Sequence, residues 1–182
     1  MNAFSYFESP IGRLLLTSDG TALTGLYMEP SRKAQCTDGW AEDVTVAPLA
    51  ATVRQLTEYF DGTRREFDLP LRLQGTVFQT RVWRELTEIP YGQTWSYGQL
   101  AKRIDKPSAS RAVGLANGRN PISILVPCHR VIGTDGSLTG YGGGIERKRW
   151  LLAHEGLDVA EKVGASMDRS SRSRVFQRDL PL

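Results

Sequence analysis

Three short apolar stretches near the N-terminus predict a small antiparallel sheet. Each has the length of a typical strand, and turn-forming residues separate them, with Pro10 and Gly12 in the first gap and Gly20 in the second. The stretches are residues 4–7, 13–17 and 23–27. Because the gaps are short, we expect successive strands to pair antiparallel.

The pattern then changes from strand to helix. The polar residues 29–47 predict a surface loop. Over residues 48–60, apolar side chains recur at three- and four-residue steps, as on one face of a helix, and Gly62 follows as a typical helix stop. An extended connection over residues 67–73 leads to Gly75, the predicted domain boundary.

The second half is predicted to be mostly helical, with a helix-turn-helix at its centre. One helix begins near Val77 and ends before Pro90. Ser96 can cap the next helix, and Pro107 ends it ahead of a further helix over residues 109–117, which is rich in alanine and glycine.

Two charged residues stand where the helix dipole disfavours their charge. With Ser108 as the predicted N-cap, Arg111 is the third residue of the helix 109–117, where a cation is unfavourable. Glu155 follows the predicted helix 145–154, where an anion is unfavourable. Charges that break a local rule mark candidate functional groups, although a solvated side chain is the commoner explanation for Arg111.

The strongest candidate for chemistry is Cys128. Residues 122–126 predict a short buried strand, and Pro127 ends it because proline lacks the N–H of a sheet ladder. Cys128, His129 and Arg130 follow directly. A strand that delivers a thiol beside an imidazole suggests a nucleophile and its base, whereas a lone cysteine is more commonly a small buried hydrophobe.

Composition narrows the class of protein. The 182 residues are 40% hydrophobic and 24% charged, which is ordinary for a soluble globular protein of one or two domains. We expect no secretory signal and no membrane span. Two cysteines and two histidines form no ligand cluster, so we expect no metal. Cys36 is expected to be incidental in a reduced, cytoplasmic protein.

Positive charge is concentrated in one segment. Residues 80–150 carry 11 basic and 5 acidic side chains, a net charge of +6, whereas residues 1–79 carry 7 and 10, a net charge of −3. A basic segment of this kind is typical of a protein that binds a polyanion. A basic face that only aids solubility remains the alternative.

Four motifs of the second half are specific in combination. They are Arg111-Ala112-Val113-Gly114, Pro127-Cys128-His129-Arg130-Val131, Tyr141-Gly142-Gly143-Gly144 and Trp150-Leu151-Leu152-Ala153-His154-Glu155-Gly156. On these motifs the chain resembles the O6-alkylguanine-DNA alkyltransferases, with the likeness running from about residue 78 to residue 156.

The resemblance implies a two-domain α/β (α+β) fold. Residues 1–75 would form a ribonuclease-H-like domain, an antiparallel sheet with a helix. Residues 76–156 would form a mostly helical domain that holds the helix-turn-helix and the active site. Residues 157–182 would be a C-terminal extension, which we expect to be flexible.

The implied activity is direct-reversal DNA repair without a cofactor. As a methylated-DNA–[protein]-cysteine S-methyltransferase, the protein would move the alkyl group of O6-alkylguanine, and of O4-alkylthymine, irreversibly to one cysteine, so each molecule would act once. The implied partner is double-stranded DNA, bound at the minor groove with little sequence specificity. We expect a cytoplasmic monomer that can cluster on DNA and does not bind membranes.

The resemblance also assigns a catalytic role to five residues. Cys128 would accept the alkyl group, His129 would activate it through a bound water, and Glu155 would orient and polarise the imidazole. Asn120 would join the helix-turn-helix to the active-site loop by hydrogen bonds. Tyr97 would donate to N3 of the guanine and contact the target phosphate.

The implied substrate and DNA contacts surround these groups. Those to the base are Tyr97, Val131, Tyr141 and Gly142. Those to DNA are Arg111, Ala112, Arg119 and Thr134. Arg111 would enter the stack where the flipped nucleotide had been. Gly142, where some relatives carry serine, would offer only its backbone N–H to the guanine oxygen.

Two other functions fit part of the pattern. A Cys-His-Glu hydrolase or acyltransferase of small molecules would explain the triad but not the basic helix-turn-helix, and it would turn over repeatedly. A non-catalytic binder of alkylated DNA would explain the helix-turn-helix, but such relatives replace the acceptor cysteine, so Cys128 argues against this function.

Overall fold

The computed structural model describes residues 2–30 and 37–157. The predictions for Cys36 and for the C-terminal extension beyond residue 157 lie outside this part of the chain.

The N-terminal half contains a four-stranded sheet, in which three strands form the predicted antiparallel meander. The strands are β1 (Ala3–Ser9), β2 (Gly12–Ser18), β3 (Leu23–Met28) and β4 (Ala41–Glu42), in the order β3-β2-β1-β4. The register of β1 and β2 runs from Ala3 opposite Ser18 to Ser9 opposite Gly12. The prediction of a loop throughout residues 29–47 is wrong at β4, which pairs parallel with the open edge of β1.

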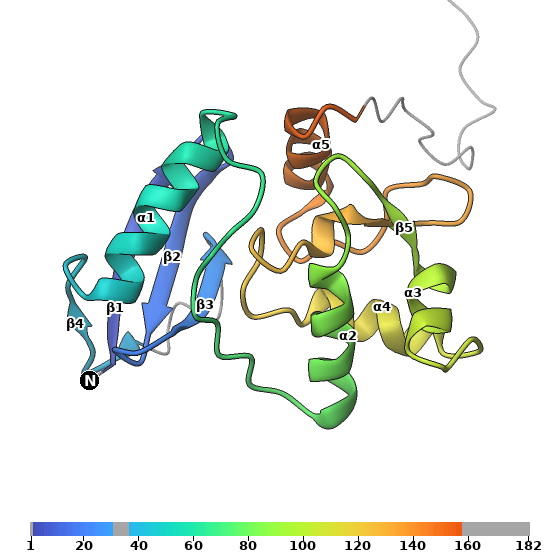
Figure 1. Ribbon diagram of the computed structural model, residues 1–182, viewed down its shortest axis with the longest axis horizontal. Coiled ribbons are helices and arrows are strands. Elements are labelled where there is room, and N and C mark those ends of the chain that lie inside the picture. The colour runs from blue at the N-terminus through green and yellow to red at the C-terminus, as the bar shows by residue number, and fades with distance from the viewer. Residues whose placement is uncertain (1, 31–36, 158–182) are drawn as a thin grey trace, which may run out of the picture.

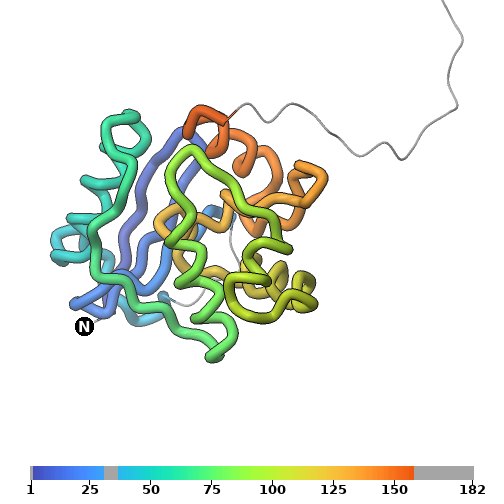
Figure 2. Tube along the Cα trace, turned by 45° about the vertical axis from the view of Figure 1, so that its right-hand side comes forward, coloured from blue at the N-terminus to red at the C-terminus, as the bar shows by residue number. Residues whose placement is uncertain are grey.

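One helix covers a face of this sheet. α1 (Ala47–Phe60) begins with proline in its first turn and ends before Gly62, whose φ of +76° suits glycine. Its apolar side packs on β1 and β2, and Figure 1 shows the helix lying against the strands. The connection to the next helix, residues 61–76, then leads from the end of α1 to the C-terminal half (Figures 1 and 2).

The C-terminal half is mostly helical, as predicted. Its elements are α2 (Val77–Thr87), β5 (Trp95–Ser96), α3 (Tyr97–Arg103), α4 (Ser110–Gly118), the short 3-10 helix η2 (Cys128–Arg130), β6 (Val131–Ile132) and α5 (Ile145–His154). Thr76 and Ser96 cap α2 and α3 through complete capping boxes. α3 and α4 form the predicted helix-turn-helix. In the described ranges, no helix has both the length and the apolar character needed to cross a bilayer.

The predicted cap of α4 is wrong. The helix begins at Ser110, its N-cap is Ala109, and no side chain caps it. Ala109 N donates to Lys106 O at 2.8 Å, which closes a turn and places Ser108 inside that turn instead of at the helix start. Arg111 is therefore the second helical residue and not the third.

The predicted strand over residues 122–126 is also wrong. Only Ile122 forms a bridge, with Leu26 of β3, and the following residues turn back on themselves. Val126 N donates to Ile122 O at 3.0 Å, so backbone groups that a strand would present to a neighbour are used within the turn. Ile124 adopts a φ of +72°, which is unusual for a β-branched residue.

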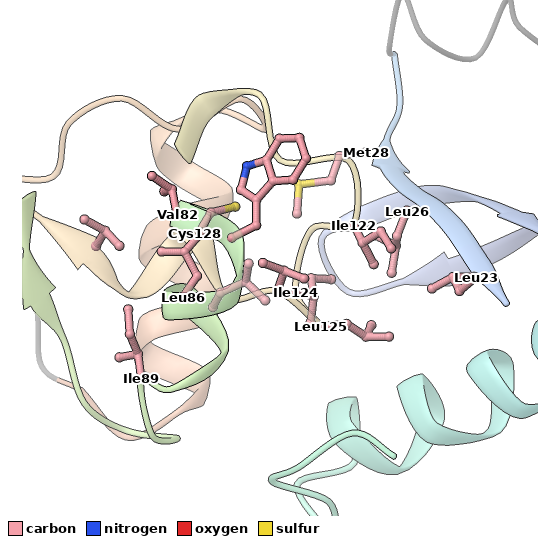
Figure 3. Packing of buried hydrophobic residues seen from close by; sticks show 14 of the residues in the cluster. Leu23, Leu26, Met28, Val82, Leu86, Ile89, Ile122, Ile124, Leu125 and Cys128 are labelled. Atoms are coloured by element: carbon pink, nitrogen blue, oxygen red, sulfur yellow. The ribbon is translucent and has the colours of Figure 1, made fainter. Parts of the chain in front are cut away.

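A shared hydrophobic core joins the two halves. Figure 3 shows side chains of β3 facing those of the turn before Cys128, and both groups belong to one buried cluster. They are Leu23, Leu26, Met28, Ile122, Ile124 and Leu125. Two hydrogen bonds reinforce this contact, from Leu26 N to Pro121 O (2.9 Å) and from Ser123 N to Leu26 O (3.2 Å). The sheet thus supports the backbone that carries the thiol.

Candidate active site

Cys128 is buried but reaches a cavity. It is the first residue of η2, directly after Pro127, and its side chain is only 4% exposed. The residue lines a cavity of about 100 Å³ together with Asn117, Asn120, Ser123, Tyr141 and Gly142. The thiol is therefore not sealed in the apolar core, as a purely structural cysteine would be.

The carboxylate of Glu155 is contacted by hydrogen-bonding groups from three parts of the chain. His129 Nε2 lies 2.8 Å from Glu155 Oε1, so the imidazole and the carboxylate are in contact. Arg130 donates twice, from Nε to Oε2 (2.8 Å) and from Nη2 to Oε1 (3.0 Å). Tyr59 of α1 donates its hydroxyl to Oε1 at 2.8 Å, and Gly92 N lies 3.3 Å from Oε2. These partners offset the unfavourable position of an anion at the C-cap of α5.

The charges of this cluster decide the tautomer of the imidazole. Burial by itself would raise the pKa of Glu155, but the hydrogen bonds and charges of His129 and Arg130 outweigh burial and hold the pKa well below its usual range. An ionised carboxylate only accepts hydrogen bonds, so Nε2 of His129 carries the proton. Nδ1 of His129, which has no hydrogen-bond partner within residues 2–30 and 37–157, is then the basic nitrogen.

Burial also keeps both reactive groups neutral at rest. It lowers the pKa of His129 although Glu155 acts in the opposite direction. It raises the pKa of the Cys128 thiol, and hydrogen bonding by Asn120 and the charge of Lys148 offset only part of that rise. The resting site is therefore a thiol and a neutral imidazole, and the thiolate forms only when a base removes the proton.

Asn120 fixes the turn that presents the thiol. Its Nδ2 donates to Val126 O at 2.7 Å, and its Oδ1 accepts from Ile122 N at 3.0 Å. Both ends of the amide are thus used inside the protein. The side chain joins the end of the helix-turn-helix to the segment before Cys128, which is where the sequence analysis placed it.

The buried Lys148 forms hydrogen bonds that hold the loop of residues 139–144, which lines the cavity. Lys148 of α5 donates from Nζ to Val131 O (2.5 Å) and to Thr139 O (2.8 Å). Burial lowers the pKa of Lys148 to about 8. Tyr97 donates its hydroxyl to the same Thr139 O at 3.0 Å. The glycine-rich loop, residues 139–144, is therefore fixed at its first residue, Thr139, whose carbonyl accepts hydrogen bonds from both Lys148 and Tyr97.

The other predicted contact residues lie in two places. Tyr141 and Gly142 line the cavity. Val131 is buried and is not among the residues that line the cavity, and its carbonyl accepts a hydrogen bond from Lys148 Nζ. Tyr97 and Arg111 instead line a separate shallow groove outside the cavity, together with Leu115 of α4. Three further residues predicted to contact DNA are exposed, namely Ala112, Arg119 and Thr134.

The sequence analysis missed several side chains of the site. It named no functional side chain in the first half of the chain, whereas Tyr59 of α1 donates to Glu155. Arg130 was noted only as part of a motif. Lys148 had a detectable signal, since it precedes the buried Leu151 and Leu152 by three and four residues and so lies on the buried face of α5. In residues 2–30 and 37–157, no three His, Cys, Asp or Glu side chains gather to hold a metal ion.

Two regions of the chain match one protein family. Residues 77–157 match the family described as 6-O-methylguanine DNA methyltransferase, DNA binding domain. Residues 2–73 match the one described as 6-O-methylguanine DNA methyltransferase, ribonuclease-like domain. Together the two matches cover nearly all of the described chain and agree with an α/β fold of two parts.

Individual proteins are similar over most of their length. The methylated-DNA--protein-cysteine methyltransferase of Mycolicibacterium paratuberculosis is 54% identical over 153 residues, which are 81% of this chain and 88% of that protein. The protein of the same name from Methanosarcina acetivorans is 50% identical over 154 residues, covering 84% and 97%. The crystal structure of Mycobacterium tuberculosis OGT in complex with DNA superimposes with a TM-score of 0.78 at 52% identity, covering 84% and 92% of the two chains. This chain therefore belongs to the O6-methylguanine DNA methyltransferase family.

Proposed function

We propose that this protein repairs DNA by transferring the alkyl group of O6-alkylguanine to Cys128. The observation that carries the proposal is the position of Cys128, which lines a cavity beside a buried His129–Glu155 pair. The family supports it as well, since the M. tuberculosis relative has been crystallised with DNA. We extend the substrate class to O4-alkylthymine, which carries an equivalent alkyl ether.

The transfer begins with the proton of the thiol. Nδ1 of His129 removes that proton through one bridging water, and Glu155 stabilises the imidazolium that forms. The Cys128 thiolate then attacks the alkyl carbon, so the S–C bond forms as the C–O6 bond breaks and guanine leaves as an anion. The Tyr97 hydroxyl, which donates to Thr139 O without substrate, turns its hydrogen to N3 of the base, and the Gly142 N–H donates to O6. Both hydrogen bonds stabilise the developing charge.

The reaction ends after one turnover. The product on Cys128 is a thioether, which carries no good leaving group, and neither His129 nor Glu155 offers a step that would cleave it. The protein is therefore consumed in proportion to the lesions that it repairs. A thiol that must stay reduced for this reaction fits the cytoplasm, where thiols persist.

The lesion has to leave the duplex to reach the buried thiol, which costs a few kcal/mol of stacking and pairing. Residues of α4 support this step, because Ala112 and Gly114 allow close approach to the minor groove and Arg111 can fill the vacated space. Arg119 and Thr134 are exposed and available to phosphates. We infer a monomer with little sequence specificity that can cluster along DNA.

Mass spectrometry of the whole protein tests the proposal. After incubation with duplex DNA that contains O6-methylguanine, we expect one added methyl group per molecule, located on Cys128 by peptide mapping. A hydrolase would instead release product repeatedly and stay unmodified. A methyl group on Cys36, or none on the protein, contradicts the assignment.

Arg111→Ala should slow repair of duplex DNA more than it slows reaction with the free base O6-benzylguanine. Only the duplex substrate must be unstacked, so we expect its rate to fall by roughly tenfold to a hundredfold while the free base reacts almost normally. The measurement is the single-turnover rate with each substrate. Arg54→Ala, an exposed arginine of α1, is the matched control. Equal losses with both substrates would remove the proposed role of Arg111.

A further inference from the structure

Asn117 lies beside the candidate nucleophile, and only the nitrogen of its side-chain amide has a hydrogen-bond partner among the described residues. It belongs to the last turn of α4, its side chain is 1% exposed, and its Nδ2 donates to Cys128 O at 3.3 Å. A backbone carbonyl can only accept a hydrogen bond, so the nitrogen of the amide must face Cys128 and the oxygen must face elsewhere. The orientation of the amide is therefore settled by its partner.

The oxygen of this amide accepts no hydrogen bond from the described residues. Oδ1 of Asn117 finds no hydrogen-bond partner in the part of the chain that the structure describes, although it is fully buried. Asn120, three residues later, uses both ends of its amide within the protein. Buried acceptors are almost always satisfied in native structures, and Asn117 lines the same cavity as Cys128, Tyr141 and Gly142. These facts point to an N–H donor on the molecule that enters the cavity.

An O6-alkylguanine offers one donor group for such a contact. Its N3 and N7 are acceptors, and alkylation of O6 removes the hydrogen from N1, so N1 becomes an acceptor too. The exocyclic amine at C2 is then the only N–H donor of the base. O4-alkylthymine has none, because its N3 has likewise lost its hydrogen.

We propose that Asn117 Oδ1 accepts a hydrogen bond from the exocyclic amine of the flipped guanine and thereby makes the site prefer O6-alkylguanine to O4-alkylthymine. This inference rests on the proposed function and narrows its substrate class. Asn117 acts as a specificity residue and takes no part in the transfer of protons or of the alkyl group. Its second contact, to the carbonyl of Cys128, holds the acceptor next to the reacting sulfur.

The test compares two lesions that differ only in the amine. Duplexes with O6-methylguanine or O6-methylhypoxanthine are reacted with excess protein, and the single-turnover rate of methylation at Cys128 is measured for each. We expect the unmodified protein to favour the base with the amine by roughly tenfold, the effect of one net hydrogen bond. Asn117→Leu, of similar volume but without an acceptor, should lower this ratio by roughly tenfold. Because each ratio compares the same pair of lesions, their intrinsic difference in reactivity cancels between proteins.

Leu115→Ala is the matched control. It changes the outer, exposed side of α4 away from the cavity, so it can alter both rates but should preserve their ratio. Asn117→Ala replaces the leucine variant if that variant does not fold. We further expect the rate with O4-methylthymine to be low in the unmodified protein and insensitive to either change at position 117.

The outcomes separate this inference from the proposed function. Methylation of Cys128 with the same ratio of the two rates in the unmodified protein and in the variants at position 117 overturns the role of Asn117 and leaves the repair activity intact. A preference that persists undiminished in Asn117→Leu or Asn117→Ala has the same meaning, since another acceptor would then read the amine. Failure of O6-methylguanine DNA to methylate Cys128 overturns both proposals.

Discussion

Replacing Cys128 by alanine should abolish methyl transfer to the protein and leave DNA binding nearly unchanged. The thiol lines the cavity but is buried, at 4% exposure, so it contributes little to the outer surface that would contact a duplex. The exposed side chains proposed for that contact, Arg111 and Arg119, are untouched. The loss of activity should therefore be complete, while a gel-shift or anisotropy titration gives an affinity close to that of the unmodified protein.

Cys36→Ala is the control for this result. It removes the other cysteine of the chain, and we expect full and stoichiometric methylation of Cys128 to remain. Residual methylation of the Cys128→Ala protein would mean that a different group accepts the alkyl group. A loss of DNA affinity equal to the loss of transfer would mean that Cys128 acts in binding or folding instead of as the acceptor.

Glu155→Gln should damage both stability and chemistry. The carboxylate is the only acidic partner of the buried Arg130 among the described residues, and it also accepts from His129 and Tyr59. Breaking a buried ion pair by removing one partner costs about 3–5 kcal/mol of unfolding free energy. Without the anion, the imidazolium that must form on His129 is no longer stabilised, so the transfer rate should fall on the order of 10²- to 10⁴-fold.

The control for this substitution is Glu146→Gln. It makes the same chemical change at the other end of α5, but Glu146 is exposed and pairs with Arg149 at the surface. Such a pair contributes little to stability. Denaturant titrations and single-turnover rates of the two variants should therefore differ strongly. Similar behaviour of both would show that Glu155 does not organise the site.

The loss of unfolding free energy at acid pH gives a second test of how much Glu155 stabilises the protein. Its pKa in the folded protein lies below the value of about 4.3 expected in the unfolded chain. The unfolded state then binds more protons as the pH falls below about 5, so the stabilisation is present above that range and is lost progressively in acid. Glu155→Gln should have a shallower decline of unfolding free energy between about pH 5 and pH 2.

The pH dependence of alkylation tests the link between Glu155 and the thiol. In the unmodified protein, burial lowers the pKa of His129, so the imidazole remains a base well into mildly acidic solution. In Glu155→Gln, the ion pair of imidazolium and thiolate loses its support, and the pKa of Cys128 should rise further. A curve of alkylation rate against pH that does not move would contradict the relay.

Local patterns in the sequence were enough for most elements of secondary structure. Short apolar stretches and the turn residues between them predicted the meander of β1 to β3, and three- and four-residue periodicity predicted α1. The helix predicted over residues 145–154 coincides with α5. The cap of α3 at Ser96 was also correct. These features depend on interactions within a few residues, so the sequence contains them directly.

The same reasoning failed where distant contacts decide the backbone. The apolar run over residues 122–126 has the composition of a strand, but Asn120 and β3 hold it as a turn. Asn120 accepts a hydrogen bond from Ile122 N, and Leu26 of β3 donates to Pro121 O and accepts from Ser123 N. A short buried run has the same composition in either state. Likewise, Ser108 was a suitable cap in type but the turn closed by Lys106 and Ala109 places it before the helix.

The candidate nucleophile, its neighbouring imidazole and the carboxylate at the end of α5 could be found in the sequence, because these residues form motifs of adjacent positions. The groups that activate and surround them could be found only in the folded protein. Tyr59 reaches Glu155 from 96 positions earlier in the chain, Lys148 holds the covering loop, and Asn117 turns its amide toward Cys128. Hydrogen-bond partners, burial and the pKa shifts that follow from them depend on which distant segments pack together, and no local pattern specifies that packing.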